Sequence, residues 1–297
     1  MTTWSPMPAA RHLRPWAPPP IDGYRPMIIN VALTGAVPSK ADNASIPLTP
    51  EEIAADVLAC ATAGATVFHL HMRDEQGDPV HRRDLYERTI APIREARPDL
   101  VLGVTTSSRV DPDLSARIIG LDLEPALRPD LASLSLGSFN FPRVVSSNPP
   151  DQIRALLEHM ANVGIRPELE VFELGMINSL WALRDQGLIP DPPIVNLLLG
   201  SMGSAPAFVS DLGQMVQRLP DGSEWAAAGI GIYQRSMTIA AAIMDGNVRT
   251  GLEDNPRGDG SATWSNVSAV QLAVEAATLA GRTIATAAEA RSRFGLS

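Results

Sequence analysis

The sequence predicts a closed (β/α)8 barrel, and three observations support this fold class. The 297-residue chain alternates short apolar runs with amphipathic segments eight times, a pattern typical of a parallel sheet with helical crossovers. Eight strands within roughly 250 residues fit a closed barrel better than an open doubly wound sheet. Candidate polar residues also gather where the strands are predicted to end. An open Rossmann-type sheet is the main alternative, and the lack of G-x-G-x-x-G after the first strand argues against it.

The predicted elements follow one another in a regular order. The strands span residues 27–33, 65–71, 101–105, 131–136, 168–172, 194–199, 225–232 and 247–252. The helices span residues 50–63, 84–97, 150–163, 176–187, 206–218, 236–245 and 265–281. The first helix has the clearest start, because Thr49 is a good N-cap, Pro50 suits the first turn and Glu52 completes a capping box.

Composition and charge exclude several classes of protein. The formal net charge of −9 argues against a nucleic-acid partner, which usually requires a basic face. No apolar run reaches the roughly 18–20 residues of a membrane span. The one cysteine, Cys60, excludes an internal disulfide and a cysteine-rich metal site, and we expect it to be buried in helix 50–63.

The start of the chain differs from the rest. Residues 1–25 are rich in proline, and we expect them to form an irregular extension before a single catalytic barrel domain, residues 26–297. The prolines interrupt any continuous apolar core, so this segment lacks the pattern of a secretory signal. A cytoplasmic location is therefore the expectation.

Two histidines close the second predicted strand. Side chains at i and i+2 of a strand point to the same face, so His69 and His71 should project side by side. The polar cluster at 249–255 lies at another strand end and could supply a carboxylate. Two histidines and a glutamate form a familiar catalytic zinc set with an open position. An isolated His-x-His is more often an ordinary strand-end pair, and the acidic cluster favours the metal.

Most candidate polar residues fall at one end of the predicted barrel. Active sites of such barrels lie at the C-terminal ends of the strands, so this bias indicates an enzyme. The residues concerned are Thr34, His69, His71, Arg73, Thr105, Ser108, Ser133, Glu170, Arg249, Glu253 and Asp254.

An ordered set of motifs extends this pattern over most of the chain. The segments are 34–36 (TGA), 48–53 (LTPEEI), 63–65 (AGA), 69–74 (HLHMRD), 137–141 (GSFNF), 167–171 (PELEV), 228–231 (AGIG) and 249–255 (RTGLEDN). In this order they resemble the beta-keto acid cleavage enzymes, whose best-known activity is 3-keto-5-aminohexanoate cleavage. The resemblance implies a barrel with a divalent metal, usually zinc, in a homotetramer. It also implies an acyl transfer in which a beta-keto acid and acetyl-CoA give acetoacetate and a new CoA ester.

The resemblance also implies roles for particular residues. His69, His71 and Glu253 should be the metal ligands. Arg249 and Asp254 should activate acetyl-CoA, with Asp254 as the base that removes a methyl proton. Three residues fall where the family holds the keto acid: Thr105, Ser108 and Ser133. Glu170 falls at a further active-site acid that could orient Arg249 or a zinc-bound histidine.

Other interpretations of these residues stay open at this stage. Glu253 and Asp254 could serve only as salt-bridge partners of Arg249, and Ser133 could be a plain strand hydroxyl. The segment 200–206 could present backbone amides to a CoA phosphate, or could be a plain strand-to-helix turn.

Two positions depart from the family pattern. The amino-keto acid enzymes have a glutamate where this chain has Val37, and burying a substrate ammonium against valine would cost on the order of 2–5 kcal/mol. We therefore expect a substrate without an amine there, carrying an apolar or neutral tail. The family's paired glycines after the third strand are Ser107 and Ser108, which restrict the turn and weaken the case for Ser108 as a carboxylate contact.

Two rival functions remain. A metal-dependent hydrolase of the amidohydrolase type also carries His-x-His in a barrel, normally on the first strand and with further histidines on later strands. Here the pair is on the second strand, and the other histidines are His12, His81 and His159, in the extension, a loop and a helix. A non-catalytic barrel that binds a keto acid would keep the ligands but lose the pair formed by Arg249 and Asp254.

Overall fold

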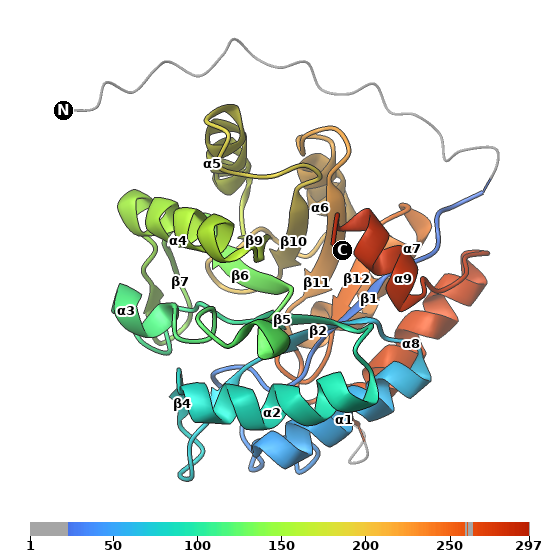
Figure 1. Ribbon diagram of the computed structural model, residues 1–297. Coiled ribbons are helices and arrows are strands. Elements are labelled where there is room, and N and C mark those ends of the chain that lie inside the picture. Colours follow the sequence, from blue (N-terminus) through green and yellow to red (C-terminus); the bar gives the residue numbers. More distant parts are fainter. Residues whose placement is uncertain (1–22, 259, 261–263, 297) are drawn as a thin grey trace.

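Eight parallel strands close into a barrel in the computed structural model, which describes residues 23–258, 260 and 264–296 (Figure 1). The barrel strands are β1 (Ile29–Ala32), β2 (Val67–Leu70), β5 (Val101–Val104), β6 (Leu131–Ser135), β9 (Arg166–Val171), β10 (Ile194–Leu199), β11 (Glu224–Gly229) and β12 (Asn247–Thr250). Their order around the barrel is β1-β12-β11-β10-β9-β6-β5-β2. Each strand therefore lies beside its neighbours in the chain, and β12 closes onto β1. The predicted fold class is confirmed.

Helices surround the strands (Figure 1). They are α1 (Pro50–Ala63), α2 (Arg83–Ala96), α3 (Leu114–Arg117), α4 (Pro150–Val163), α5 (Leu174–Asp185), α6 (Val209–Val216), α7 (Gln234–Ile243), α8 (Asn266–Leu279) and α9 (Ala287–Arg293). Short 3-10 turns, η1 (Pro125–Leu127) and η2 (Gly231–Tyr233), and two small hairpins, β3–β4 (Met72–Arg73 and Pro79–Val80) and β7–β8 (Phe139–Asn140 and Val145–Ser146), complete the fold. Between β5 and β6 only the four-residue α3 and η1 form, in place of a long helix.

Local sequence determines where several helices begin. Helix α1 starts as predicted: the Thr49 side chain accepts a hydrogen bond from the Glu52 amide, and Glu52 bonds back to the Thr49 amide. Cys60 is buried on this helix, as expected. Helix α6 was expected from residue 206 but begins at Val209, because residues 200–205 form a turn closed by its own hydrogen bonds.

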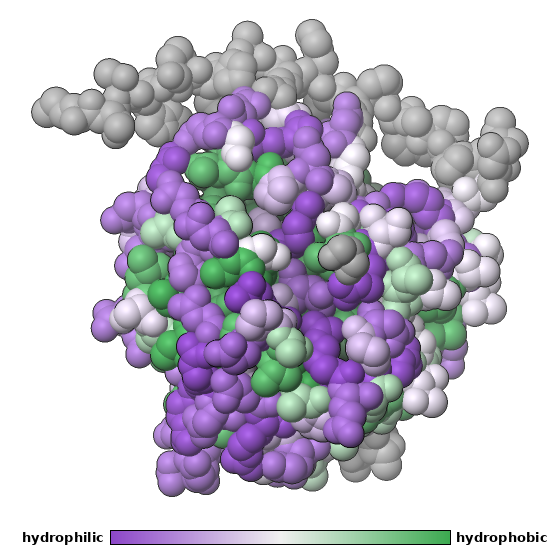
Figure 2. Space-filling view, viewed as in Figure 1, coloured by the Kyte–Doolittle hydropathy of each residue, from purple (hydrophilic) through white to green (hydrophobic). Residues whose placement is uncertain are grey.

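Helix α9 covers the end of the barrel opposite the site. Ala290 on this helix and Phe294 directly after it pack on side chains at or just before the first residues of several strands: Ile28, Val67, Val101, Leu131 and Ile194. Figure 1 shows α9 lying across the near side of the barrel, and Figure 2 shows a mostly hydrophilic surface with scattered apolar groups in the same view. The functional end of the barrel is therefore the opposite one, where the strands end.

The described residues before β1 lie on the barrel wall. The Tyr24 hydroxyl donates to the Ile243 carbonyl at 2.9 Å, and the Arg25 side chain pairs with Asp245 and Glu224. Residues 1–22 of the predicted extension lie outside the described residues. No helix in the described part of the chain combines the length and the apolar character needed to cross a bilayer.

Candidate active site

The histidines of β2 form one wall of the barrel mouth. His69 and His71 are 1% and 2% exposed, and their Nε2 atoms lie 3.1 Å apart. Their rings meet edge to face, with centroids 5.0 Å apart. The period of two along the strand therefore places both imidazoles on the inner face, as the sequence pattern predicts.

Glu253 reaches these histidines because the barrel closes. Strand β1 lies between β12 and β2, so the turn after β12 is only one strand away from the imidazoles. The Glu253 carboxylate oxygens lie 3.8 Å from His69 Nε2 and 3.5 Å from His71 Nε2. Gly35, at φ +67°, makes the space: a Cβ there would lie 2.5 Å from Glu253 Cγ.

The three residues fit a metal ion. One donor atom from each of His69, His71 and Glu253 lies within 4.8 Å of the others. Two ligand atoms at tetrahedral positions about 2.0–2.1 Å from zinc lie about 3.3 Å apart, and the observed separations of 3.1, 3.5 and 3.8 Å bracket that value. Three protein ligands leave one tetrahedral position for substrate.

Glu168 stands behind the first histidine, although the sequence analysis did not single it out. Its carboxylate is 2% exposed, lies 3.7 Å from His69 Nδ1 and accepts a hydrogen bond from Asn30 Nδ2 at 2.5 Å. Strands β6 and β5 separate β9 from β2, so the contact with His69 crosses the barrel interior. A carboxylate facing the other ring nitrogen fixes the tautomer and the orientation of a ligating histidine. The sequence did carry one signal for Glu168: it lies two residues from Glu170 on the same strand, so both side chains should point to the same face.

The charges in the mouth favour neutral imidazole at His71. Burial lowers the pKa of His71 to about 4, so its ring is free to bind a metal at neutral pH. Burial also depresses the pKa of His69, but the carboxylates of Glu253 and Glu168 outweigh it and raise that pKa overall. Burial would raise the pKa of Glu253, yet the imidazoles and Arg249 hold it well below its usual range.

Arg249 binds three carboxylates at once. Its Nε and Nη2 donate to the two oxygens of Asp254 at 3.0 and 3.3 Å, a bidentate pair. Nη2 also donates to Glu253 at 3.1 Å, and Nη1 donates to Glu170 at 3.2 Å. Ser135 donates to the other oxygen of Glu170 at 2.9 Å. Four donations leave little free capacity on a guanidinium with five N–H groups, so Arg249 orients these acids.

Asn266, at the start of α8, holds the turn that carries the acids. Its Oδ1 accepts from the Leu252 amide at 2.7 Å, and its Nδ2 donates to the Leu33 carbonyl and to Asp56 at 3.1 and 2.7 Å. The turn starts at Gly251, whose φ of +132° and close approach to the Ala32 carbonyl exclude a side chain. The side chain of Asn266 thus joins the end of β1 to the turn after β12.

The residues predicted to hold the keto acid lie on β6 and just after β5, whose C-terminal ends are at the same end of the barrel as the histidines. Thr105 and Ser108 follow β5, and Ser133 lies within β6 in register with Glu168, so its side chain shares the interior face. Thr105 Oγ1 accepts from the Ser107 amide at 3.1 Å. Ser108 Oγ is buried with no hydrogen-bond partner among the described residues, so this hydroxyl is available to a ligand.

Comparison with known proteins identifies the family. A model of the beta-keto acid cleavage enzyme family matches residues 26–296. The chain belongs to this family. It is 36% identical over 276 residues to a 3-oxoadipate:acetyl-CoA acetyltransferase from Cupriavidus necator, covering 92% of this chain and 95% of that one. It is also 36% identical over 273 residues to a 3-keto-5-aminohexanoate cleavage enzyme from Fusobacterium nucleatum, covering 91% and 98%.

Solved structures agree on the fold. The apo structure of ObcA superimposes with a TM-score of 0.74 at 23% identity, covering 85% of this chain; the chain spans only 66% of ObcA. The predicted family is confirmed, and the chain is an enzyme of the acyltransferase class, as a beta-keto acid cleavage enzyme.

The valine that departs from the family pattern lies at the rim. Val37 is 71% exposed, in the loop between β1 and α1. Arg73, which is buried, anchors this loop by donating to the Gly35 and Pro38 carbonyls, both at 2.9 Å. Val37 therefore sits on a fixed loop beside the glycine that contacts Glu253.

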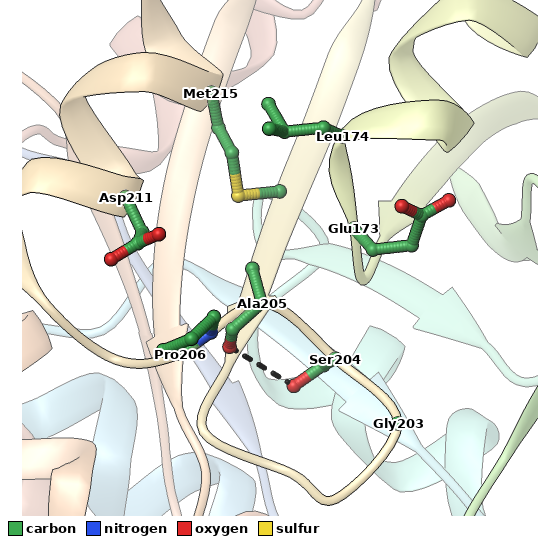
Figure 3. A pocket seen from close by; sticks show the side chains of 8 residues that line it. All are labelled: Glu173, Leu174, Gly203, Ser204, Ala205, Pro206, Asp211 and Met215. Carbon is green, nitrogen blue, oxygen red and sulfur yellow. Dashed lines mark hydrogen bonds between the residues drawn. The ribbon is translucent and has the colours of Figure 1, made fainter.

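The segment 200–206 is a turn beside a groove of about 340 Å³ between α5 and α6 (Figure 3). Its Gly200 and Ser204 amides already donate within the turn, and the Ala205 amide donates to the Phe172 carbonyl. The groove also carries the carboxylates of Glu173 and Asp211. Amides already in use and a negative lining favour the plain-turn interpretation over a CoA phosphate site.

Arg109 is a further charged residue at this end of the barrel, and no sequence pattern predicted it. It follows Ser108 on the loop after β5, and its guanidinium lies 3.9 Å from the centroid of the Phe141 ring. Arg109 also helps to lower the pKa of His71, so its charge acts on the metal-ligand group. A single arginine in a predicted loop gives no periodic signal, and only the folded loop places it in the mouth.

Proposed function

We propose that this chain is a metal-dependent beta-keto acid cleavage enzyme that converts a beta-keto acid and acetyl-CoA into acetoacetate and a new acyl-CoA. The observation that carries the proposal is the three-ligand group of His69, His71 and Glu253 beside the buried pair of Arg249 and Asp254. The names of the relatives support the reaction, since three of them specify acetyl-CoA as a partner of an oxo acid or dehydrocarnitine.

The donor set favours zinc. Two imidazole nitrogens and a carboxylate are typical of catalytic zinc, and a bound cation would polarise the ketone of the substrate. The chain's own part is to hold the ligands in place: Glu168 orients His69, and Arg249 holds the Glu253 carboxylate.

The atom balance of the reaction determines which proton Asp254 removes. Acetoacetate contains the acetyl group intact, joined to the two carbons at the carboxyl end of the keto acid. The new bond must therefore join C2 of the keto acid to the acetyl carbonyl carbon. The base is needed at C2, and not at the acetyl methyl group as the sequence analysis expected. Asp254 is 6% exposed, and Arg249 donates hydrogen bonds to both of its carboxylate oxygens. We therefore assign Asp254 as the base that removes the C2 proton.

The remaining steps follow from the same balance. The C2 carbanion adds to the thioester carbonyl, and the CoA thiolate leaves. The thiolate then attacks C3, the C2–C3 bond breaks, and acetoacetate leaves as a carbanion that regains the proton from Asp254. Products are acetoacetate and the CoA ester of the remaining acyl fragment. Glu170 is hydrogen-bonded to Arg249 and Ser135. It therefore stabilises the guanidinium of Arg249, which orients Asp254 as the base.

The keto acid that fits this mouth lacks an amine. Thr105, Ser108 and Ser133 present hydroxyl groups to the carboxyl end of the substrate, with Ser108 Oγ free to donate. At the rim, Val37 offers no charge to an ammonium.

Acetoacetate release from a panel of beta-keto acids tests the proposal. With zinc-loaded protein and acetyl-CoA, we expect acetoacetate and a new CoA thioester in equal amounts from keto acids without an amine, measured by mass spectrometry. We expect 3-keto-5-aminohexanoate to react at least about tenfold more slowly, because Val37 gives its ammonium group no carboxylate with which to pair.

Other outcomes would identify the rival functions. Release of acid or ammonia from amides without any CoA thioester would indicate an amidohydrolase. The structure gives this rival little support, because His81 bonds to Tyr86 and His159 to Asp122, away from the ligand group of the described residues. Tight keto-acid binding without turnover would indicate a non-catalytic barrel.

We also propose that the enzyme is a homo-oligomer, a tetramer by family analogy. Large apolar side chains are exposed on two adjoining segments, the loop before α6 with the first residue of α6, and η2: Met202, Phe208, Val209 and Ile232. The segments touch, because a Cβ on Gly200 would lie 2.5 Å from the Tyr233 ring. Light scattering should give four times the 31.7 kDa mass, and F208E should lower the mass. A monomeric wild type would contradict this.

A further inference from the structure

The guanidinium of Arg109 is a cation without a partner at the barrel mouth. Among the residues that the structure describes, it forms no ion pair with a carboxylate and donates no hydrogen bond; it lies 3.9 Å from the centroid of the Phe141 ring. The other arginine in the mouth, Arg249, is by contrast bound to three carboxylates. A partly buried guanidinium without a partner is a site for an anion.

Aromatic packing fixes the position of Arg109. Phe141 packs against Phe139 with ring centroids 4.7 Å apart, and Phe139 stacks on Phe172 at 4.0 Å. Phe172 follows β9, so the cluster joins the loop after β6 to the end of a barrel strand. The guanidinium lies 3.9 Å from the centroid of the Phe141 ring in this cluster. This contact holds the planar face of the guanidinium and leaves its N–H edges free for a ligand.

Arg109 lies on the loop after β5, at the end of the barrel that carries the metal-ligand group. Burial lowers its pKa, while the carboxylates of Glu253 and Glu170 act in the opposite direction. These two acids are already committed to Arg249, and Glu253 also faces the histidines. Arg109 therefore remains charged beside the metal-ligand group with no protein carboxylate left to pair with it.

The carboxyl end of a beta-keto acid already has its contacts. Its carboxylate would meet the hydroxyl groups assigned to it above, among them the free hydroxyl of Ser108, while its ketone would meet the cation held by His69, His71 and Glu253. A monocarboxylic substrate would leave the partly buried Arg109 unpaired in the complex, which is unfavourable. A substrate with a second carboxylate on its tail would pair it.

We propose that Arg109 is a specificity-determining residue that binds the tail carboxylate of a beta-keto dicarboxylate, an inference that rests on the proposed function. The substrate tail expected from Val37 was apolar or neutral, whereas the tail proposed from Arg109 is anionic. The step balances as before: a six-carbon 3-oxo dicarboxylate and acetyl-CoA give acetoacetate and the CoA thioester of a four-carbon dicarboxylate. The tail carboxylate takes no part in bond making, so Arg109 acts on binding.

Matched substrates test this role. 3-Oxoadipate and 3-oxohexanoate have six carbons each and differ in whether the tail ends in a carboxylate or a methyl group. We expect the wild type to prefer 3-oxoadipate. R109Q should lower kcat/KM for 3-oxoadipate about 10- to 100-fold, mainly through KM, and leave the value for 3-oxohexanoate within about threefold. R109K, which keeps the charge, should recover part of the loss.

A binding measurement separates this proposal from the proposed function. Calorimetry with zinc-loaded protein should show adipate binding that weakens in R109Q, and no such change for hexanoate. Loss of both activities to the same extent, an effect confined to the KM for acetyl-CoA, or a wild type that prefers 3-oxohexanoate would overturn the role of Arg109. If neither keto acid reacts but adipate binding still depends on Arg109, the reaction is wrong and the anion site stands.

Discussion

Replacing Asp254 with asparagine is expected to lower kcat by about 10²- to 10⁴-fold while the metal stays bound. The amide has nearly the shape of the carboxylate and can still accept one hydrogen bond from Arg249, so the turn after β12 should keep its form. It cannot take up a proton from C2 of the keto acid. The loss should therefore appear in chemistry and not in metal content or in folding.

The protonation of Asp254 gives this prediction a pH signature. Burial raises its pKa, Arg249 lowers it and Glu253 raises it again, with a net upward shift. A base works only when deprotonated, so kcat/KM should fall as the pH drops through this raised pKa. The acid limb of the wild-type profile should lie above the usual range of an aspartate and should be absent in D254N.

Deuterium exchange is the direct measurement. Wild-type enzyme in D2O should exchange the C2 protons of a keto acid, followed by NMR above the spontaneous rate, and D254N should not. D84N, at an exposed aspartate paired with Arg82 on α2, is the matched control and should behave as wild type. Exchange at the wild-type rate in D254N would exclude Asp254 as the base. Exchange at the acetyl methyl group instead of C2 would restore the original assignment.

Much of the site followed from strand periodicity. The rule that i and i+2 share a face placed His69 beside His71 without any knowledge of the fold, and the structure has their Nε2 atoms 3.1 Å apart. The approach of Glu253 required more, because only closure of β12 onto β1 brings it near β2. The eight strands predicted that closure, and the family resemblance named the residue.

The parts that the sequence did not predict depend on contacts across the barrel. Glu168 touches His69 from a strand three positions away, and no local pattern shows which carboxylate on β9 turns toward which partner. Glu170 was expected to orient either Arg249 or a zinc-bound histidine, and in the structure it bonds to Arg249. Arg109 owes its place to Phe141, thirty-two residues later in the chain, and such loop packing has no periodicity.

Replacing His69 with alanine is expected to abolish metal binding and activity together. The remaining two ligands would have to hold the ion without the imidazole, and Glu253 is also bound to Arg249. E168Q should give an intermediate result, since loss of an outer partner typically weakens metal affinity about 10- to 100-fold. Metal content after dialysis and zinc affinity by competition with a chelator measure both effects.

The order of the variants is the informative result. If zinc is held by His69, His71 and Glu253, affinity must fall from wild type to E168Q to H69A, and activity must follow it. H159A, at a surface histidine paired with Asp122 on the outside of the barrel, should change neither quantity. Thermal unfolding of each variant, measured with excess chelator, separates ligand loss from misfolding, because a ligand effect disappears when no metal is present. Retention of stoichiometric zinc in folded H69A would mean that the ion is bound elsewhere, and the chemistry assigned to the barrel mouth would lose its Lewis acid.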